Sequence, residues 1–267
     1  MSRRNRVRRH MRLLAPIVLA VCSALVGPLA AAARTLEEAL ADGERAYAAA
    51  NLEEARKAFA EALQTTPGHV ATLCRLSRVE SELGETQKGD TQRLTWADAV
   101  VHAREAVRAA PDLAEPHVTL AVALGRQALR EGPKARLALS KEIKAETDLA
   151  LKIDPNIGRA WHVLAMWNVK ISGLSGLEKM IANSVLGGVP KGASTANAEQ
   201  AFQKAIALEP DYINHHLEYG RFLKDMKRTD DARRELEKAV ALPATSSALD
   251  PRFQAEAREL LAKLPKK

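Results

Sequence analysis

The sequence predicts an all-α protein, a solenoid built from about five helical hairpins. The first observation behind this prediction is composition: the chain is rich in Ala, Leu, Glu, Lys and Arg, which lose little rotamer freedom in a helix. The second is a repeated junction, in which an alanine near the end of one helical segment is followed five residues later by a proline. Long runs of β-branched residues bounded by turns are absent, so we expect no sheet.

The repeated junction occurs four times along the chain. A proline cannot continue a helix, because it has no N–H and its ring disfavours a helical residue before it. Each junction therefore separates two helices, and the four lie at Ala62 and Pro67, Ala106 and Pro111, Ala150 and Pro155, and Ala205 and Pro210. Successive prolines are 44, 44 and 55 residues apart.

The first segment, residues 36–67, has the residue pattern of a tetratricopeptide hairpin, a repeat of about 34 residues. Gly43, Ala55 and Ala62 stand where the two helices cross closely, and Phe59 is the aromatic residue of the second helix. The later junctions fit the same pattern. We therefore expect repeats at about residues 36–69, 70–113, 114–157, 158–212 and 213–246.

The middle repeats must contain additional residues, because their prolines are farther apart than about 34 positions. Since the helix ends align, we place these residues between the two helices of each hairpin, at about 84–94, 130–140 and 170–195. The first insert is polar and is expected to form a loop, and the second is expected to lengthen helices. The third predicts an inserted helix in the fourth repeat, followed by a loop at 187–192, because it carries apolar residues at helical spacing, Leu177, Met180 and Ile181.

The last segment, residues 251–265, predicts a capping helix. Phe253, Ala257, Leu260 and Leu264 fall on one face of it. Stacked helical repeats need a terminal element whose outer surface is polar, and this segment is the candidate.

Residues 1–33 have the three parts of a secretory signal peptide. Six arginines precede an apolar run at 13–26, and small residues follow at 30–33. We expect cleavage near Ala33 and export of the repeat domain, residues 34–267, to the periplasm. An uncleaved membrane anchor is the alternative, because residues 13–33 are just long enough to span a bilayer.

The formal net charge of +7 belongs almost entirely to this leader. Residues 34–267 contain 34 basic and 33 acidic side chains. A protein that binds duplex nucleic acid usually concentrates positive charge on one face of the folded domain. We therefore expect no nucleic-acid partner.

Three features together resemble the regulator of microtubule dynamics family over about residues 40–265: the lengthened middle hairpins, the blocks at 73–78 and 155–167, and the Gly- and Pro-containing insert before Ala198. The chain is identified as an exported bacterial member. The resemblance implies helical repeats without enzymatic activity, and eukaryotic members are associated with microtubules, mitochondria and organelle membranes. We expect a non-enzymatic protein-binding scaffold. Two alternatives remain open: binding or transfer of a lipid or other amphipathic anionic ligand, with residues 176–186 as a lid, and a microtubule-binding role, which the export signal disfavours.

Motifs that carry catalytic or metal chemistry are missing from the sequence. No His-x-x-x-His or Cys-x-x-Cys pair is present, so we expect no metal or cofactor. The segment from Gly187 to Ser194 resembles a phosphate loop but has Ala193 at the position of the phosphate-binding lysine. His215 and His216 are expected to lie in solvent at a helix start. We name no catalytic residue and predict that the chain is not an enzyme.

A partner-binding groove is predicted from the repeat register. In tetratricopeptide arrays the first helix of each hairpin lines the concave groove, chiefly through its second, fifth, sixth, ninth, twelfth and thirteenth positions. Arginine pairs with carboxylate or phosphate through two hydrogen bonds, so an acidic peptide or an anionic amphipathic ligand fits best. The predicted groove residues are Arg75, Arg78, Val118, Val122, Arg159, His162, Met166, Lys170, Asn214, Leu217, Arg221 and Lys224.

Overall fold

A computed structural model of the protein describes residues 34–185 and 188–265. The predicted signal peptide, residues 1–33, lies outside the described residues, as does the start of the predicted loop 187–192. The described residues belong to one unit, Arg34–Lys267, and form twelve α-helices without a strand. The all-α prediction is confirmed. Within the described ranges, no helix has both the length and the apolar character needed to cross a bilayer.

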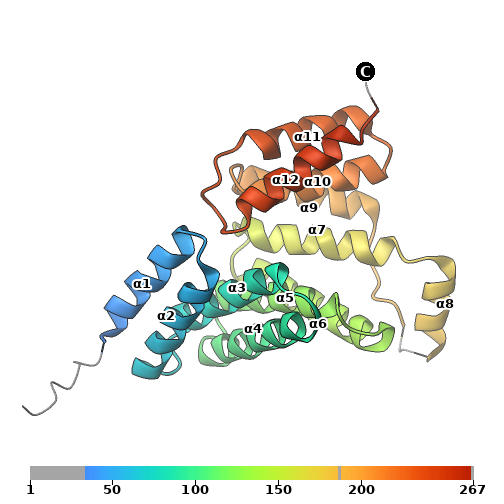
Figure 1. Ribbon diagram of the computed structural model, residues 1–267. Helices are drawn as coiled ribbons and strands as arrows, with labels where there is room; N and C mark the ends of the chain where they lie inside the picture. Colours follow the sequence, from blue (N-terminus) through green and yellow to red (C-terminus); the bar gives the residue numbers. More distant parts are fainter. Residues whose placement is uncertain (1–33, 186–187, 266–267) are drawn as a thin grey trace, which may run out of the picture. The chain divides into compact units, whose positions relative to one another are not determined.

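The helices pack as a series of antiparallel pairs, which can be followed in Figure 1: α1 with α2, α3 with α4, α5 with α6, α7 with α9, and α10 with α11. Among the first helices of these pairs, α3 also touches α5 and α5 touches α7, while α12 packs against α10 and α11. The bounds are α1 (Leu36–Ala48), α2 (Leu52–Thr65), α3 (Val70–Thr86), α4 (Gly89–Ala109), α5 (Ala114–Ala128), α6 (Pro133–Ile153), α7 (Gly158–Ser172), α8 (Gly176–Val185), α9 (Thr195–Leu208), α10 (Ile213–Asp225), α11 (Thr229–Ala241) and α12 (Asp250–Ala262).

The alanine–proline junctions end the helices as the sequence predicts. At each junction the residue before the proline donates its backbone N–H to the carbonyl of the junction alanine, four positions earlier. The proline then stops the helix, since it has no N–H to continue the series. The four closing bonds are Thr66 to Ala62, Ala110 to Ala106, Asp154 to Ala150, and Glu209 to Ala205.

Small residues allow close approach within each pair. Ala55, Ala62, Ala106, Ala150 and Ala205 have no exposed surface, which confirms their predicted place at helix crossings. At two positions even the methyl group of an alanine would not fit, and a glycine is present. A Cβ atom on Gly43 would collide with the ring of Phe59, and one on Gly84 would collide with the indole of Trp96.

The first insert differs from its prediction. Residues 84–94 were expected to form a loop, but α3 continues to Thr86 and α4 begins at Gly89, so the insert lengthens both helices. Gly84 is required for contact with Trp96 and does not break the helix. The second insert lengthens α6 to 21 residues, as predicted. The third contains α8, as predicted, but this helix stands beyond the end of α7 and makes no extensive contact with α1, α3 or α5, so it is not a lid over their face (Figure 1).

Residues 242–249, which we call the strap, connect α11 to α12 and reach back to the first two hairpins. The carbonyl of Ser246 accepts a hydrogen bond from Arg78 at 2.6 Å. The backbone N–H of Ala248 donates to the hydroxyl of Tyr47 at 3.3 Å. The strap therefore joins the last part of the unit to α1 and α3.

Candidate functional site

A recess of about 310 Å³ lies on the face formed by α1, α3, α5 and α7. Arg75, Arg78 and Arg159 line it, so the structure brings together three of the predicted groove arginines. Phe59 and Val79, each 1% exposed, supply apolar surface beneath them. The recess therefore combines cationic groups with an apolar floor.

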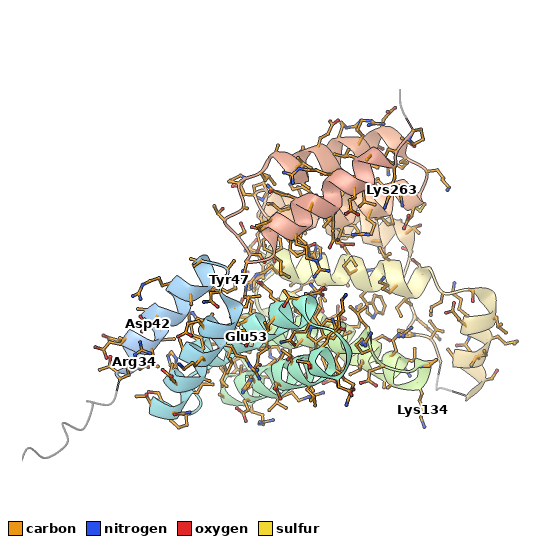
Figure 2. The ribbon with its side chains drawn as sticks, in the orientation of Figure 1. Arg34, Asp42, Tyr47, Glu53, Lys134 and Lys263 are labelled. Carbon is orange, nitrogen blue, oxygen red and sulfur yellow. The ribbon has the colours of Figure 1, made fainter. Side chains whose placement is uncertain are left out.

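Tyr47 holds one end of the recess. Its hydroxyl donates to the carboxylate of Glu82, at 2.8 Å from Oε1, and accepts the N–H of Ala248 from the strap. Burial raises the pKa of this phenol, and the negative charge of Glu82 adds to the effect. The guanidinium of Arg78 lies 4.7 Å from the centre of the Tyr47 ring and pairs with Glu82 at 3.2 Å. Figure 2 shows Tyr47 near the end of α1, on the side of the strap.

The other two arginines of the recess each have an acidic partner on a neighbouring first helix. Arg75 on α3 pairs with Glu44 on α1. Arg159 on α7 pairs with Glu115 on α5, with Nη2 to Oε2 at 2.8 Å. All four side chains are about a third or more exposed. These pairs orient the guanidinium groups but leave them open to exchange with another carboxylate.

Cys74 contributes to the same recess but shows no sign of activation. Its side chain is buried, and burial raises the pKa of the thiol to about 11. A reactive cysteine has a lowered pKa, because the thiolate is the nucleophile. Cys74 therefore acts as a small apolar residue here.

Farther along the same face, an ion-pair network ties the cap to the middle repeats. Arg221 on α10 pairs with Glu256 on α12 at 3.1 Å, and Glu85 at the end of α3 pairs with Arg126 on α5 at 2.6 Å. Arg252 joins the two halves, since it contacts both Glu85 and Glu256. The predicted groove residue Arg221 is thus committed to the protein's own acidic groups.

The half-buried His162 on α7 stacks on His215 on α10, which has no exposed surface. The two rings are stacked with centroids 4.9 Å apart, and their Nδ1 atoms are 3.1 Å apart. Burial and the neighbouring imidazole hold the pKa of His162 well below its ordinary value of 6.5. Burial also lowers the pKa of His215, although Glu209 opposes this shift. The prediction that His215 and His216 lie in solvent is wrong: they are 0% and 2% exposed.

The remaining predicted groove residues do not line the recess. Leu217 has no exposed surface and Val118 only 1%, so both belong to the core. Met166 is half-buried against the largest apolar cluster. Lys170 is exposed and acts electrostatically on Glu218, while Lys224 pairs with Asp225. Two more are half-buried, Val122 and Asn214.

Three residues of the recess region were missed from the sequence: Glu44, Tyr47 and Glu82. The signal that would have found them is the same repeat register. Counted from Leu36, Glu44 and Tyr47 hold the ninth and twelfth positions of the first hairpin, and Glu82 holds the thirteenth of the second, counted from Val70. The prediction selected groove positions from the second hairpin onward, and so it omitted the helix that supplies Tyr47.

A larger hollow of about 600 Å³ lies between α2, α3 and α4. Its one deeply buried charge is Glu80, which accepts hydrogen bonds from Arg56 at 3.2 Å and from His102 at 2.7 Å. Arg56 also pairs with Asp98 at 2.8 Å. Arg56 is the one arginine among the residues that line this hollow, whereas three arginines line the recess.

Comparison with known proteins assigns the chain to a family. The family model described as "Regulator of microtubule dynamics protein 1-3" matches residues 31–265. The chain belongs to the regulator of microtubule dynamics family. This confirms the resemblance seen in the sequence.

Two relatives in this family match a similar share of this chain but different shares of their own length. Regulator of microtubule dynamics protein 3 of Rattus norvegicus is 28% identical over 190 residues, which is 70% of this chain but only 40% of the rat protein. Regulator of microtubule dynamics protein 1 of Caenorhabditis elegans is 29% identical over 191 residues, 72% of this chain and 84% of the nematode protein. The chain thus spans less than half of the rat relative.

A solved structure supports the fold independently. The crystal structure of a thermophilic TPR protein from Thermus thermophilus superposes with a TM-score of 0.62 and 16% identity, covering 83% of this chain and 98% of the other. The tetratricopeptide-like architecture of this family member is therefore shown by both sequence and structure.

Proposed function

We propose that the protein is a non-enzymatic scaffold that binds a protein partner through the recess. The single observation that carries this proposal is the placement of three arginines above an apolar floor, on the face of the first helices. The partner segment we propose combines acidic and apolar side chains. Its carboxylates would exchange with those of Glu44 and Glu115, since exposed ion pairs contribute only about 0–1 kcal/mol each.

The size of the recess favours a peptide over a large ligand. Small-molecule sites usually measure about 300–1,000 Å³, and 310 Å³ is at the low end of that range. Such a volume accepts one or two side chains. A lipid or other anionic amphipathic ligand is the second candidate, because it has the same preference for arginines beside apolar surface.

We also propose that the scaffold acts in the periplasm after removal of residues 1–33. The arginine-rich start, apolar run and small residues of the leader support this. N-terminal sequencing of protein from the cell envelope should begin near Arg34. Recovery of the intact N-terminus in the membrane fraction would favour the anchored alternative.

A photo-crosslinking amino acid placed at Ala71 tests the site. Ala71 is exposed and lines the recess, so a bound segment should be captured there and identified by mass spectrometry. We expect a segment with acidic and apolar residues. The same amino acid at the exposed Ala109, at the end of α4, should not capture it. Native mass spectrometry of the same protein separates the candidates, because a lipid-binding protein would carry bound lipid.

Replacement of two recess arginines provides the matched comparison. Arg75→Gln with Arg159→Gln removes two cations and leaves Arg78 to hold the strap. Capture at Ala71 should fall about tenfold, the equivalent of one or two lost charged contacts. Arg93→Gln with Arg108→Gln removes the same charge from exposed positions on α4, which contributes no lining residue to the recess, and should leave capture unchanged. Equal capture by both double variants would show that the recess is not the site.

A further inference from the structure

An apolar face on α8 is left uncovered by the rest of the described protein. Leu177 is 62% exposed, Met180 58% and Ile181 44%. Their spacing of three and four positions places them on one side of the helix. These three residues, which we call the α8 face, form a continuous apolar surface on a helix that packs extensively on no other helix.

Local hydrogen bonds hold α8 in place without covering this face. Ser175 and Glu178 form reciprocal hydrogen bonds at the start of the helix, with the N–H of Glu178 donating to the hydroxyl of Ser175 at 3.2 Å. At the other end, the side chain of Asn183 accepts the N–H of Val189 at 3.0 Å. Ala182, on the opposite side, is buried. Both ends of the helix are therefore hydrogen-bonded locally, while its apolar face points outward.

Positive charge is concentrated around α8. The segments 130–136 and 170–192 together contain six basic and two acidic side chains, whereas the whole of 34–267 is nearly neutral. The two segments are close to each other: Leu139, Leu174 and Val189 pack on the same apolar cluster. Hydrogen bonds from Ser175 lower the pKa of Glu178, and the charge of Arg136 on α6 adds to this effect.

Several of these cations are available to a partner. Lys134 and Lys191 are exposed, and no ion pair of either with an acidic group occurs among the described residues. Lys134 is labelled in Figure 2 at the beginning of α6. Exposed cations beside an apolar helix face are the combination that binds the surface of an anionic bilayer.

We propose that α8 and its surrounding cations form a docking site for an anionic lipid surface, with Leu177, Met180 and Ile181 entering the headgroup region. A second copy of the chain fits less well, because a stable dimer buries about 800 Å² per partner, far more than three side chains provide. This inference is separate from the recess: it names a second surface, and its test leaves the proposed partner site untouched.

Vesicle flotation of residues 34–267 tests the proposal. This unit contains its own core and helix caps, and removal of the leader avoids binding by its six arginines. We expect flotation with vesicles of equal parts phosphatidylcholine and phosphatidylglycerol, and none with phosphatidylcholine alone. Raising the salt concentration should weaken binding, since surface charges are screened.

Two double variants make the test specific. Leu177→Glu with Met180→Glu should lower the partition coefficient about tenfold or more, because it removes apolar surface and adds negative charge. Leu94→Glu with Val101→Glu makes the same kind of change on α4, where the side chains are 56% and 53% exposed, and should bind like the unmodified unit. Equal loss in both variants, or no binding by the unmodified unit, would overturn the proposal.

A fluorescence measurement gives a second readout that does not depend on loss of binding. Leu177→Trp keeps the face apolar and should give emission at shorter wavelength when anionic vesicles are added. Leu94→Trp should show no such shift. If the emission of Leu177→Trp instead changes with protein concentration in the absence of vesicles, the α8 face is an interface between copies of the chain and the proposal is wrong.

Discussion

At the scale of single residues, the sixth residue after three of the junction prolines bonds back to that proline. His117 bonds to the carbonyl of Pro111, Trp161 to Pro155 and His216 to Pro210, each at 2.8 Å. The two histidines also contact carboxylates, of Glu146 at 2.5 Å and Glu235 at 2.7 Å. These bonds satisfy carbonyl groups that lie in the turns between helices.

The close contact between Gly43 and Phe59 predicts that alanine substitutions at Gly43 and at Gly125 change the free energy of unfolding in opposite directions. Gly43→Ala should lower the free energy of unfolding by about 1–3 kcal/mol, because the new methyl group meets the ring of Phe59. Gly125→Ala, inside α5 with no atom near the added Cβ, should raise it by about 0.5–1 kcal/mol. Urea unfolding measures both. Similar effects of the two substitutions would contradict the packing at Gly43.

The pair of His162 and His215 predicts loss of stability in mild acid. The native pKa values of both rings lie below the ordinary 6.5. Just below pH 6.5, these histidines therefore bind more protons in the unfolded chain than in the native protein. The free energy of unfolding should therefore fall as pH drops from about 6.5 through the lowered native values. His162→Gln should make this dependence shallower.

His102, whose pKa is raised in the native protein, serves as the control. Burial disfavours the charged form of His102, but the hydrogen bond and charge of Glu80 outweigh burial and raise its pKa. The stability that it contributes is present at low pH and is lost as pH rises through the raised value. His102→Gln should therefore steepen the acid loss. Chemical denaturation across the pH range would contradict the assignment if both variants changed the slope in the same direction.

At the scale of elements, the hydroxyl group of Tyr47 is one of two side-chain groups from α1 and α3 that hold the strap. Tyr47→Phe removes the group that donates to Glu82 and accepts from Ala248. We expect a loss of about 1–3 kcal/mol, because a largely buried carboxylate loses a donor. Amide hydrogen exchange in the strap should also accelerate. Tyr219→Phe removes a comparable bond to Glu199 away from the strap, so strap exchange should stay unchanged in that variant.

Helix pairing was predictable from the sequence because each alanine–proline junction is a local signal. The structure of the first insert was not predictable, because polar residues occur both in loops and at the hydrogen-bonded ends of long helices. Gln92 and Thr95 are polar, yet they bond to the carbonyl of Gly84 and the side chain of Gln87 across the turn between two longer helices. The recess was predicted in part: the register located its arginines, but the carboxylates that pair with them and the strap depend on contacts between distant segments.

At the scale of the whole described unit, contacts between its first and last parts predict cooperative unfolding. Simple repeat arrays unfold as nearest-neighbour units, since each repeat touches only the next. Here Arg78 contacts Ser246, and Arg252 donates to the carbonyl of Glu85 at 2.7 Å. Hydrogen exchange in denaturant should give the same midpoint for α1–α2 and for α10–α12.

Removal of the contacts made by Arg78 and Arg252 should give α1–α2 and α10–α12 different denaturant midpoints. Arg78→Gln with Arg252→Gln breaks the links to Ser246 and Glu85, so the first hairpins should unfold at lower denaturant than the last ones. Arg93→Gln with Arg234→Gln removes two surface arginines that pair only within their own helices. That control should keep a single midpoint, and a single midpoint in both double variants would show that the distant contacts carry no cooperativity.

The reach of the strap also fixes the order in which the native state can be completed during synthesis. The chain emerges from its N-terminus, so α1 to α4 are made long before Ser246, which lies 168 residues after Arg78. Each hairpin can form early from contacts that are local in sequence, which are fast to make. Tyr47 must wait 201 residues for its bond to Ala248. The first hairpin of the described unit therefore gains these contacts only after α11 has been made.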